Sequence, residues 1–497
     1  MIREKMIFLG CLLVASSAIA KPLTLEERVM KLEKLLEVQV EENKKLQSQI
    51  FEEGQIVEED KNQEKTDDVT IVKRVSKLER EAELWEVHGY ASLQYRVTDD
   101  GSSSGTNFGK GDFFLGLPGT GESSNQVELV TKRKFYGKNG VFGELNLRAE
   151  YGNGDSYYYS SSGSEHDNGK GNFEIKEAYI NMGGFNYLPQ NATIWGGRRF
   201  LNRNATFLSG EFYKQSSGMG FGYEQNGLSL AVVAVDPGAE DGKSASTLED
   251  GLGRRTVTSF DFNYAGISVP GGSLDLGAKI YVQPNAKEAP ESGNKPGNPN
   301  AAENGFGLGF VYNTNYYGLT DGFASHAFNY GHGIGAHATG GMNFGQWTDG
   351  ALKDSYTMLA TTGGLINLNE KWQLGTEISA LHGDQLYGLS GHLTRAGLSI
   401  QPSYKVNDNF RMVFGASIGM QKIQDYKHNW GGLQKETQVR YGLSVAPTFT
   451  VDSDYFGRPQ IQPFVTWVKT NFDGGFGGDL SKEKSQVLFG VKSEVWF

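Results

Sequence analysis

The sequence predicts an all-β protein, a transmembrane antiparallel β-barrel of about eighteen strands preceded by a helical coiled-coil segment. From residue 88 onward, apolar and polar residues alternate with a period of two, as they do in strands with one buried and one wet face. The 497 residues include 67 glycines and 12% aromatics but only 38% hydrophobic residues. Apart from a shorter stretch near the start, no apolar run has transmembrane-helix length. A membrane barrel accounts for all three observations because alternation lowers its mean hydropathy.

The first twenty residues match the pattern of a secretory signal peptide. Arg3 and Lys5 are positively charged, residues 6–15 are mostly apolar, and residues 18–20 (AIA) form a small-residue cleavage site. A membrane anchor is the alternative, but the apolar run is short and polar residues follow at once. We therefore expect residues 1–20 to be removed on export. Cys11, the single cysteine, would leave with them, which excludes disulfides and thiol chemistry.

Residues 21–86 are rich in Glu and Lys and are predicted to be a periplasmic coiled coil with a linker. A heptad pattern places these residues on one seam: Leu25, Val29, Leu32, Leu36, Gln39, Asn43, Leu46 and Ile50. After an acidic linker, a second stripe contains Ile71, Val75, Leu78, Ala82 and Trp85. Stripes this narrow bury little unless a partner helix covers them, so we expect an intersubunit coiled coil. A single amphipathic helix lying on the barrel mouth is the alternative.

Residues 87–497 are predicted to form the barrel, and the closing strand has its clearest pattern. Its lipid face would carry Val487, Phe489, Val491, Ser493, Val495 and Phe497. Its other face would carry Leu488, Gly490, Lys492, Glu494 and Trp496. The segments 141–150 and 274–283 show the same split. An apolar face suits lipid and a polar face suits a water-filled interior, so we expect outer-membrane lipid around the barrel.

The connections between the predicted strands alternate in length. Tight turns are expected at residues 138–140, 226–227 and 407–409. Long loops rich in Gly and Ser are expected at residues 101–121, 152–172, 239–253 and 285–303. Short turns at one end and long loops at the other are typical of porins in the outer membrane.

One predicted loop differs from the others because it contains charged and aromatic anchors. It joins a strand ending near Arg199 to one beginning near Gly218. Its Arg198, Arg203 and Glu211, with several rings, favour a loop that folds inward and narrows the pore. An ordinary external loop is the alternative.

Two rings are predicted to lie on the polar face of their strands. Tyr90 shares its face with Ser92, Gln94 and Arg96, and Trp496 shares its face with Glu494 and Lys492. Barrel aromatics usually girdle the lipid interface, so an inward ring is unusual. Sugars stack their C–H faces on rings and hydrogen-bond through their hydroxyls. The pattern therefore favours contact with a sugar, and packing against an inward loop is the alternative.

At several short motifs, the chain resembles the maltoporin family of carbohydrate porins. The motifs are residues 88–91 (HGYA), 193–200 (TIWGGRRF), Arg458-Pro459 with 464–466 (FVT), and 489–497. The leader resembles that of the sucrose porins, a branch of the family. The resemblance implies a homotrimer of eighteen-stranded barrels that passes oligosaccharides by facilitated diffusion, along an aromatic slide and through a polar constriction.

The resemblance also implies roles for individual residues. The slide positions are Tyr90, Phe323, Phe456 and Trp496. The constriction positions are Glu128, Lys176, Arg203, Glu211 and Tyr213, to which we add Arg199 of the same loop. Ser92, Gln126 and Ala205 depart from the family pattern, which leaves the identity of the sugar open. Candidates for a ring lent by a neighbouring subunit are Tyr157, Tyr158 and Tyr159.

Other classes of function fit the sequence less well. We expect no enzyme, no metal and no cofactor, because the sequence offers no nucleophile–base pair or ligand motif, and its histidines, among them His326 and His332, are scattered through predicted lumen or loop positions. A formal net charge of −11 argues against nucleic acid as a partner. A general diffusion porin for small hydrophilic solutes remains the alternative to a sugar channel. The leader would be able to bind the cell wall alongside transport.

Overall fold

The computed structural model describes most of the predicted barrel. It covers residues 84–101, 108–121, 125–152, 172–235, 256–284, 286–288, 299–319, 321–337, 340–344, 352–386, 391–424, 437–473, 475–477, 480–481 and 483–497. The predicted signal peptide, almost all of the predicted coiled-coil segment and Tyr157–Tyr159 lie outside the described residues.

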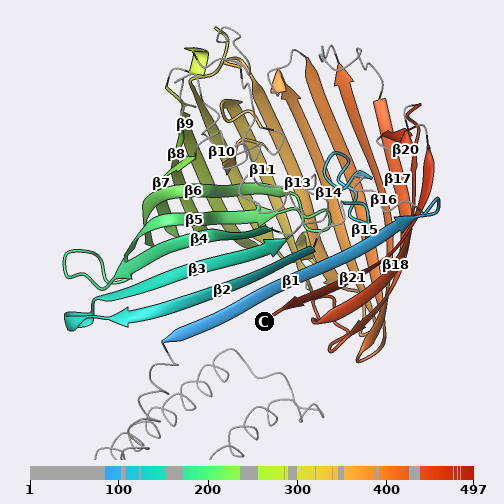
Figure 1. Cartoon of the computed structure of the whole chain (residues 1–497), viewed down its shortest axis with the longest axis horizontal. Helices are drawn as coiled ribbons and strands as arrows, with labels where there is room; N and C mark the ends of the chain where they lie inside the picture. Colours follow the sequence, from blue (N-terminus) through green and yellow to red (C-terminus); the bar gives the residue numbers. More distant parts are fainter. Residues whose placement is uncertain are drawn as a thin grey trace, which may run out of the picture. The chain divides into compact units, whose positions relative to one another are not determined.

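The described strands confirm the predicted barrel (Figure 1). A 19-stranded sheet contains eighteen long strands and one two-residue strand, β12 (Asn343–Phe344). The long strands are β1 (Trp85–Thr98), β2 (Asn125–Tyr136), β3 (Phe142–Gly152), β4 (Asn172–Gly183), β5 (Thr193–Ala205), β6 (Phe212–Gln225), β7 (Leu228–Val235), β8 (Val257–Val269), β9 (Gly272–Val282), β10 (Asn304–Thr314), β11 (Phe323–Gly333), β13 (Tyr356–Asn367), β14 (Trp372–Asp384), β15 (His392–Asn407), β16 (Phe410–Gln424), β17 (Thr437–Thr450), β18 (Gln460–Thr470) and β21 (Ser485–Trp496). The short strands β19 (Gly475–Gly477) and β20 (Leu480–Ser481) pair separately.

The last long strand closes the ring. β21 pairs antiparallel with both β18 and β1, and its register with β1 runs from Tyr90 opposite Trp496 to Thr98 opposite Leu488. The amide of Gly89 donates a hydrogen bond of 2.8 Å to the carbonyl of Phe497. Closure pairs the strand edges, which an open sheet would leave without hydrogen-bond partners. Within the described segments, we find no helix with the length and apolar character that a membrane crossing requires.

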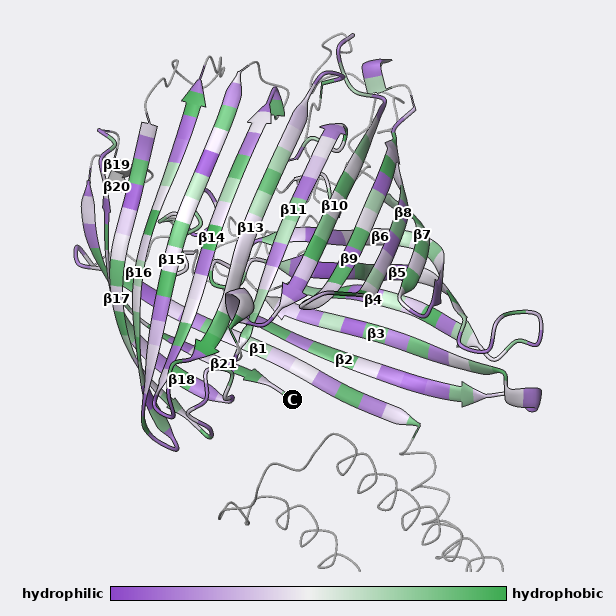
Figure 2. Cartoon of the chain, turned by 180° about the vertical axis from the view of Figure 1, so that it is seen from behind, coloured by the Kyte–Doolittle hydropathy of each residue, from purple (hydrophilic) through white to green (hydrophobic). Residues whose placement is uncertain are grey.

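The two faces of the wall separate as the alternation predicts. On β9, Leu276 and Ile280 are exposed on the outside, whereas Lys279 and Tyr281 are buried on the inside. On β21, Phe489 and Val491 are exposed while Leu488 and Glu494 are buried. In Figure 2, green and purple segments alternate along the strands. This arrangement presents apolar side chains to lipid and collects polar groups within the ring.

The structure corrects the predicted placement of three residues, Trp85, His326 and His332. Trp85 was expected to end the second helical stripe, but it begins β1, opposite Arg133, whose guanidinium carbon lies 5.0 Å from the centre of its ring. Strand pairing and this ring contact replace the helical period. His326 and His332 were expected in the lumen or a loop. They instead share the outer face of β11 with the exposed Phe328, and they stack on Tyr312 and Phe306 respectively.

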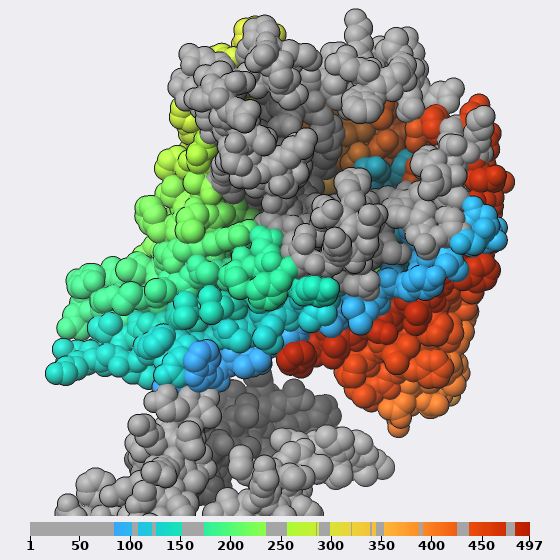
Figure 3. Space-filling model, viewed as in Figure 1, coloured from blue at the N-terminus to red at the C-terminus, as the bar shows by residue number. Residues whose placement is uncertain are grey.

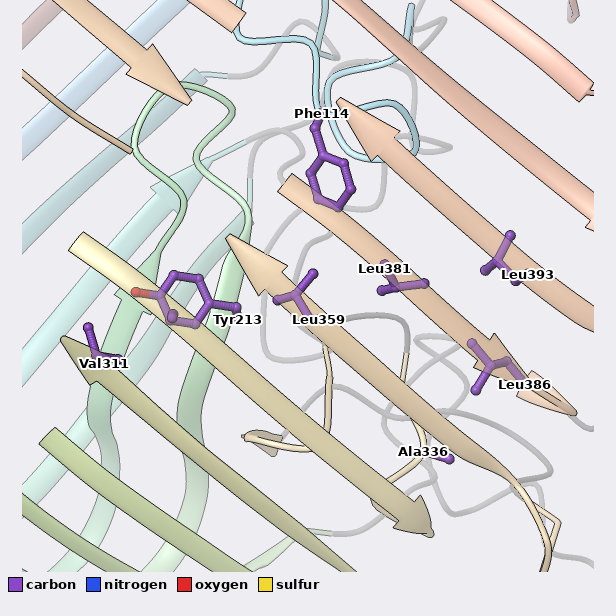
Figure 4. Packing of buried hydrophobic residues seen from close by; sticks show 9 residues of the cluster. Phe114, Tyr213, Val311, Ala336, Leu359, Leu381, Leu386 and Leu393 are labelled. Atoms are coloured by element: carbon purple, nitrogen blue, oxygen red, sulfur yellow. The ribbon is translucent and has the colours of Figure 1, made fainter. Parts of the chain in front are cut away.

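Inside the ring, segments from three connections pack against the wall. Residues 108–121 follow β1, residues 206–211 join β5 to β6, and residues 334–337 and 340–344 follow β11. A buried apolar cluster joins the first of these segments, through Phe114, and the third, through Ala336, to Tyr213 of β6 and to Leu359 and Leu381 of β13 and β14 (Figure 4). In Figure 3, blue atoms of the segment after β1 lie against the orange far wall within the opening. These segments therefore fill part of the barrel interior, and the pore is the space that remains beside them.

Candidate functional site

The hairpin of β5 and β6 leaves the barrel wall and enters the lumen. Pairing between β4 and β5 stops at Ala178 opposite Arg198, although β5 continues to Ala205. The Glu177 carboxylate accepts a 2.9 Å hydrogen bond from the Phe200 amide, one of the groups that β4 no longer pairs. The predicted strand ends near 199 and 218 are therefore wrong, because both strands extend further and only residues 206–211 form the loop. The expected inward fold is confirmed.

The tip of the hairpin is fixed to the opposite wall by one carboxylate. Glu377, on β14, accepts hydrogen bonds from the amides of Leu208 (2.5 Å) and Ser209 (2.9 Å) and from the Ser209 hydroxyl (2.6 Å). Its side chain is buried, with 1% of its surface exposed. A buried amide that loses its hydrogen-bond partner costs about 1–3 kcal/mol, so these bonds hold the tip across the lumen. We call this contact the Glu377 latch.

The stem of the hairpin is held by the near wall. Lys279 of β9 donates a 2.8 Å hydrogen bond to the carbonyl of Gln215 and forms a 3.0 Å ion pair with Asp261 of β8. The Ser216 hydroxyl is bonded to both of these charged groups. Beside it, β12 pairs in parallel with Gln215 and Ser216. Both ends of the hairpin are thus anchored to the barrel wall.

Charged residues of alternating sign cover the inner wall of β2, β3 and β4. Arg148 forms ion pairs with Glu128 and Glu177. Lys176 lies 3.5 Å from a Glu150 carboxylate oxygen and 3.4 Å from one of Glu174. A bulge opposite Arg148 and Ala149 turns the consecutive Lys176 and Glu177 to the same inner face. The predicted Glu128 and Lys176 therefore lie in one charged network, whose other members the sequence analysis did not single out.

The remaining predicted constriction residues have different surroundings. Arg199 forms a 3.0 Å ion pair with Glu224 and lies over the rings of Tyr179 and Trp195, at 4.7 and 5.1 Å. Arg203 lies 4.4 Å from the ring centre of Phe212. The buried residues of the set are Glu211 and Tyr213, with 8% and 3% exposed. They sit in the hairpin itself, and Tyr213 packs in the apolar cluster.

A group of rings gathers where the hairpin tip approaches the wall. Phe207, at the tip, has its ring centre 5.5 Å from that of Phe323, 5.8 Å from Tyr455 and 6.3 Å from Phe456. Phe323 and Phe456 stack on each other at 6.1 Å. Both are also substantially exposed, at 39% and 46%. The structure thus brings together two predicted residues and two that were missed. An apolar side chain at the tip of a polar loop was the available signal for Phe207.

The other two predicted rings lie beside a buried carboxylate on β21. The Tyr90 hydroxyl donates a 3.2 Å hydrogen bond to Glu494, and Arg458 forms a 2.7 Å ion pair with the same carboxylate. The Arg458 guanidinium also lies 4.6 Å from the ring centre of Trp496, which is 45% exposed. Lys492 and Gln460 complete the contacts of Glu494, at 2.9 and 3.1 Å. Arg458, outside the predicted set, therefore fixes both the acid and the ring.

Replacing Arg458 by alanine is expected to destabilise the barrel closure. The change removes two charge-assisted hydrogen bonds that the guanidinium donates to one oxygen of the buried Glu494, each contributing about 1.5–3 kcal/mol, while the ion pair with Lys492 remains. Heat-modifiable gel migration measures the effect as a lower unfolding temperature. Lys484→Ala is the matched control, because its ion pair with Asp473 is exposed and contributes at most about 1 kcal/mol. Equal unfolding temperatures for the two variants would contradict the role given to Arg458.

The closed ring, the inward hairpin and the charged inner wall together define a porin-type membrane channel. The sequence profile of the LamB porin family matches residues 85–497, so the chain belongs to the LamB porin family. Similar proteins include a maltoporin of Vibrio cholerae, 24% identical over 413 residues and covering 77% of this chain and 92% of the relative. Maltoporin 1 of Klebsiella pneumoniae is 23% identical over 417 residues, with 83% and 93% covered.

Among solved structures, OccAB2 of Acinetobacter baumannii aligns with a TM-score of 0.44 at 10% identity, covering 84% of this chain and 98% of that one. OpdK of Pseudomonas aeruginosa aligns at 0.43 and 12%, with 84% and 99% covered. Family membership makes the chain a carbohydrate-type channel of the outer membrane and confirms that it is not an enzyme. Within the described residues, no group of His, Cys, Asp and Glu is arranged to hold a metal ion.

Proposed function

We propose that this protein carries out facilitated diffusion of oligosaccharides across the outer membrane. The observation that carries the proposal is the group of rings between the hairpin tip and the wall. We define the aromatic lane as Phe207, Phe323, Phe456, Trp496 and Tyr90. Exposed rings inside a barrel offer stacking surfaces to the C–H faces of sugars, and the charged network on β2, β3 and β4 offers partners for their hydroxyls.

The aromatic lane is suited to the passage of sugars rather than to tight binding. The ring centres of Phe207, Phe323 and Phe456 lie within 6.3 Å of one another, and Trp496 lies against Arg458, two residues after Phe456. A sugar in the proposed lane would exchange one stacking partner for the next. Conduction requires binding that is favourable enough for entry and weak enough for exit. Stacking without a closed pocket meets both conditions. No covalent step is involved, and the flux follows the concentration gradient.

The constriction residues are proposed to act through hydrogen bonds to sugar hydroxyls. Glu128, Lys176 and Arg199 are fixed by ion pairs, so they keep their orientation while solutes pass. Gln126 donates hydrogen bonds of 2.7 and 3.3 Å to Glu128 and Glu150, and so adds an amide to this wall at a position where the resemblance to maltoporins implies a slide tyrosine. This replacement shortens the lane at that point, and the proposal accordingly leaves the sugar unnamed.

We further propose that the protein is a homotrimer with outer-membrane lipid around its exposed apolar faces. The heptad stripes of residues 25–50 favour association through a periplasmic leader. A general diffusion porin is the second candidate, because the described interior also contains many fixed charges. In that case, the rings of the lane would serve packing alone.

Ion current through single channels in a planar bilayer distinguishes the two candidates. We expect added oligosaccharide to block the current in a saturable, concentration-dependent way, because a sugar in the lane excludes ions. A panel of mono-, di- and oligosaccharides then identifies the preferred length. A current that no sugar reduces would remove the sugar channel and leave the general diffusion porin.

A further inference from the structure

A polar cavity lies beside the tight turn that joins β6 to β7, apart from the residues of the aromatic lane. Its volume is about 280 Å³, and β5 to β8 with the tight turn at residues 226–227 line it. The lining offers amide, hydroxyl and carboxylate groups, including those of Asn202, Gln225 and Thr193. No aromatic ring and no lysine or arginine is among its described lining residues. The volume falls just below the roughly 300–1,000 Å³ of drug-sized sites, so it suits one small polar ligand.

Two buried acceptors in this lining lack protein partners. The Ser229 hydroxyl and the side-chain amide oxygen of Asn263 have no hydrogen bond within the described residues. Each residue is only 6% exposed, and the two stand opposite each other on β7 and β8. A buried polar atom left unpaired costs about 1–3 kcal/mol, so a ligand that pairs with both gains this energy on binding.

The other side of the cavity is already held in place. Glu224 is fixed by its 3.0 Å ion pair with Arg199, whose guanidinium rests on the rings of Tyr179 and Trp195. Asn202 has a left-handed backbone, with φ of 51°, where the hairpin bends. Asparagine tolerates this conformation better than most residues. A ligand therefore meets groups that need little ordering when it binds.

We propose that this cavity is a side subsite for one hexose-sized polyhydroxylated unit, held by hydrogen bonds without ring stacking. Each sugar hydroxyl both donates and accepts, as the amide and hydroxyl lining requires. A phosphate would face the Glu224 carboxylate, and a metal cation would find one carboxylate that Arg199 already neutralises. The inference rests on the proposed function only in that sugars must enter the lumen.

Saturation-transfer NMR with D-glucose and the full-length protein in detergent micelles tests the site. The measurements use the Trp496→Ala background, which weakens the lane. Asn263→Leu replaces the side-chain amide by an apolar group, and we expect it to raise the apparent Kd for glucose by about tenfold. Asn181→Leu is the matched control, because the side-chain amide oxygen of Asn181 is also buried and unpaired but lies outside the cavity lining. That variant should leave the Kd within twofold.

Ser229→Val removes the other unpaired acceptor and serves as a second variant if Asn263→Leu does not fold, as judged by heat-modifiable migration. Glucose affinity that survives both cavity variants would overturn the subsite, as would the absence of glucose binding in the parent. Current block by oligosaccharide is measured in parallel in the wild type and in Asn263→Leu with Trp496 retained. If oligosaccharide does not block the current of the wild-type channel, the proposed function fails. If it blocks the current of the Asn263→Leu variant as it does that of the wild type, sugar binding in the cavity is distinct from sugar passage along the lane.

Discussion

Glu377→Ala is expected to release the hairpin from the far wall and to widen the pore. The change removes the three hydrogen bonds that hold the tip and a fourth from the Ser379 hydroxyl, each contributing about 0.5–1.5 kcal/mol. The amides of Leu208 and Ser209 would be left unpaired, so the tip gains by moving into water. Single-channel recording should show a larger ion conductance with frequent steps between levels, and a weaker block by oligosaccharide.

Two further variants make this result specific to the latch. Glu377→Gln keeps one acceptor oxygen and should give an intermediate conductance. Glu370→Ala removes an exposed carboxylate from the turn before β14 and should leave both conductance and block unchanged. A wild-type conductance in Glu377→Ala would show that the stem contacts of Lys279 and Asp261 suffice to hold the hairpin, and would contradict the latch.

Phe207→Ala is expected to weaken oligosaccharide block more than any other ring variant. Phe207 contacts Phe323, Phe456 and Tyr455, so its removal interrupts the lane at the hairpin tip. Loss of a stacking contact reduces the binding free energy of the sugar by about 0.5–1.5 kcal/mol, apart from the apolar surface that is no longer buried. This reduction corresponds to a roughly 3- to 10-fold weaker apparent affinity. Current block as a function of oligosaccharide concentration measures this affinity.

The control for this variant is Phe328→Ala, which removes the same side chain from the outer face of β11. Its block should match the wild type. Phe207→Ala should also retain the trimer and the wild-type unfolding temperature to within a few degrees, because the ring is not fully buried. An unchanged sugar affinity in Phe207→Ala would remove this ring from the path.

The sequence predicted the barrel because each strand repeats one simple rule. In β21, for example, alternate residues meet lipid or lumen, and no long-range information is needed to assign Phe489 or Glu494 to a face. The extent of the β5–β6 hairpin was not predictable in this way. Once a strand leaves the wall, neither of its faces meets lipid, so the period-two pattern stops at Arg199 although the strand continues.

Site residues could be predicted where their own place on a strand face is unusual. They could not be predicted where their role depends on contact with residues far away in the sequence. Tyr90 and Trp496 stand out as rings on polar faces, and they occupy neighbouring strands in the structure. Glu377 is an ordinary lumen-facing carboxylate in sequence. Its role arises only because residues 208 and 209 cross the barrel to reach it. The same holds for Arg458, because its partners Glu494 and Trp496 lie on β21, about forty positions further along the chain.

The central claim is that sugars pass along the aromatic lane between the hairpin tip and the wall. A crystal structure of the full-length protein with a bound oligosaccharide tests it most directly. We expect consecutive sugar rings stacked on Phe456, Phe207 and Trp496, with hydroxyls directed to charged side chains of the inner wall. An oligosaccharide bound elsewhere in the lumen, with these rings unoccupied, would contradict the account.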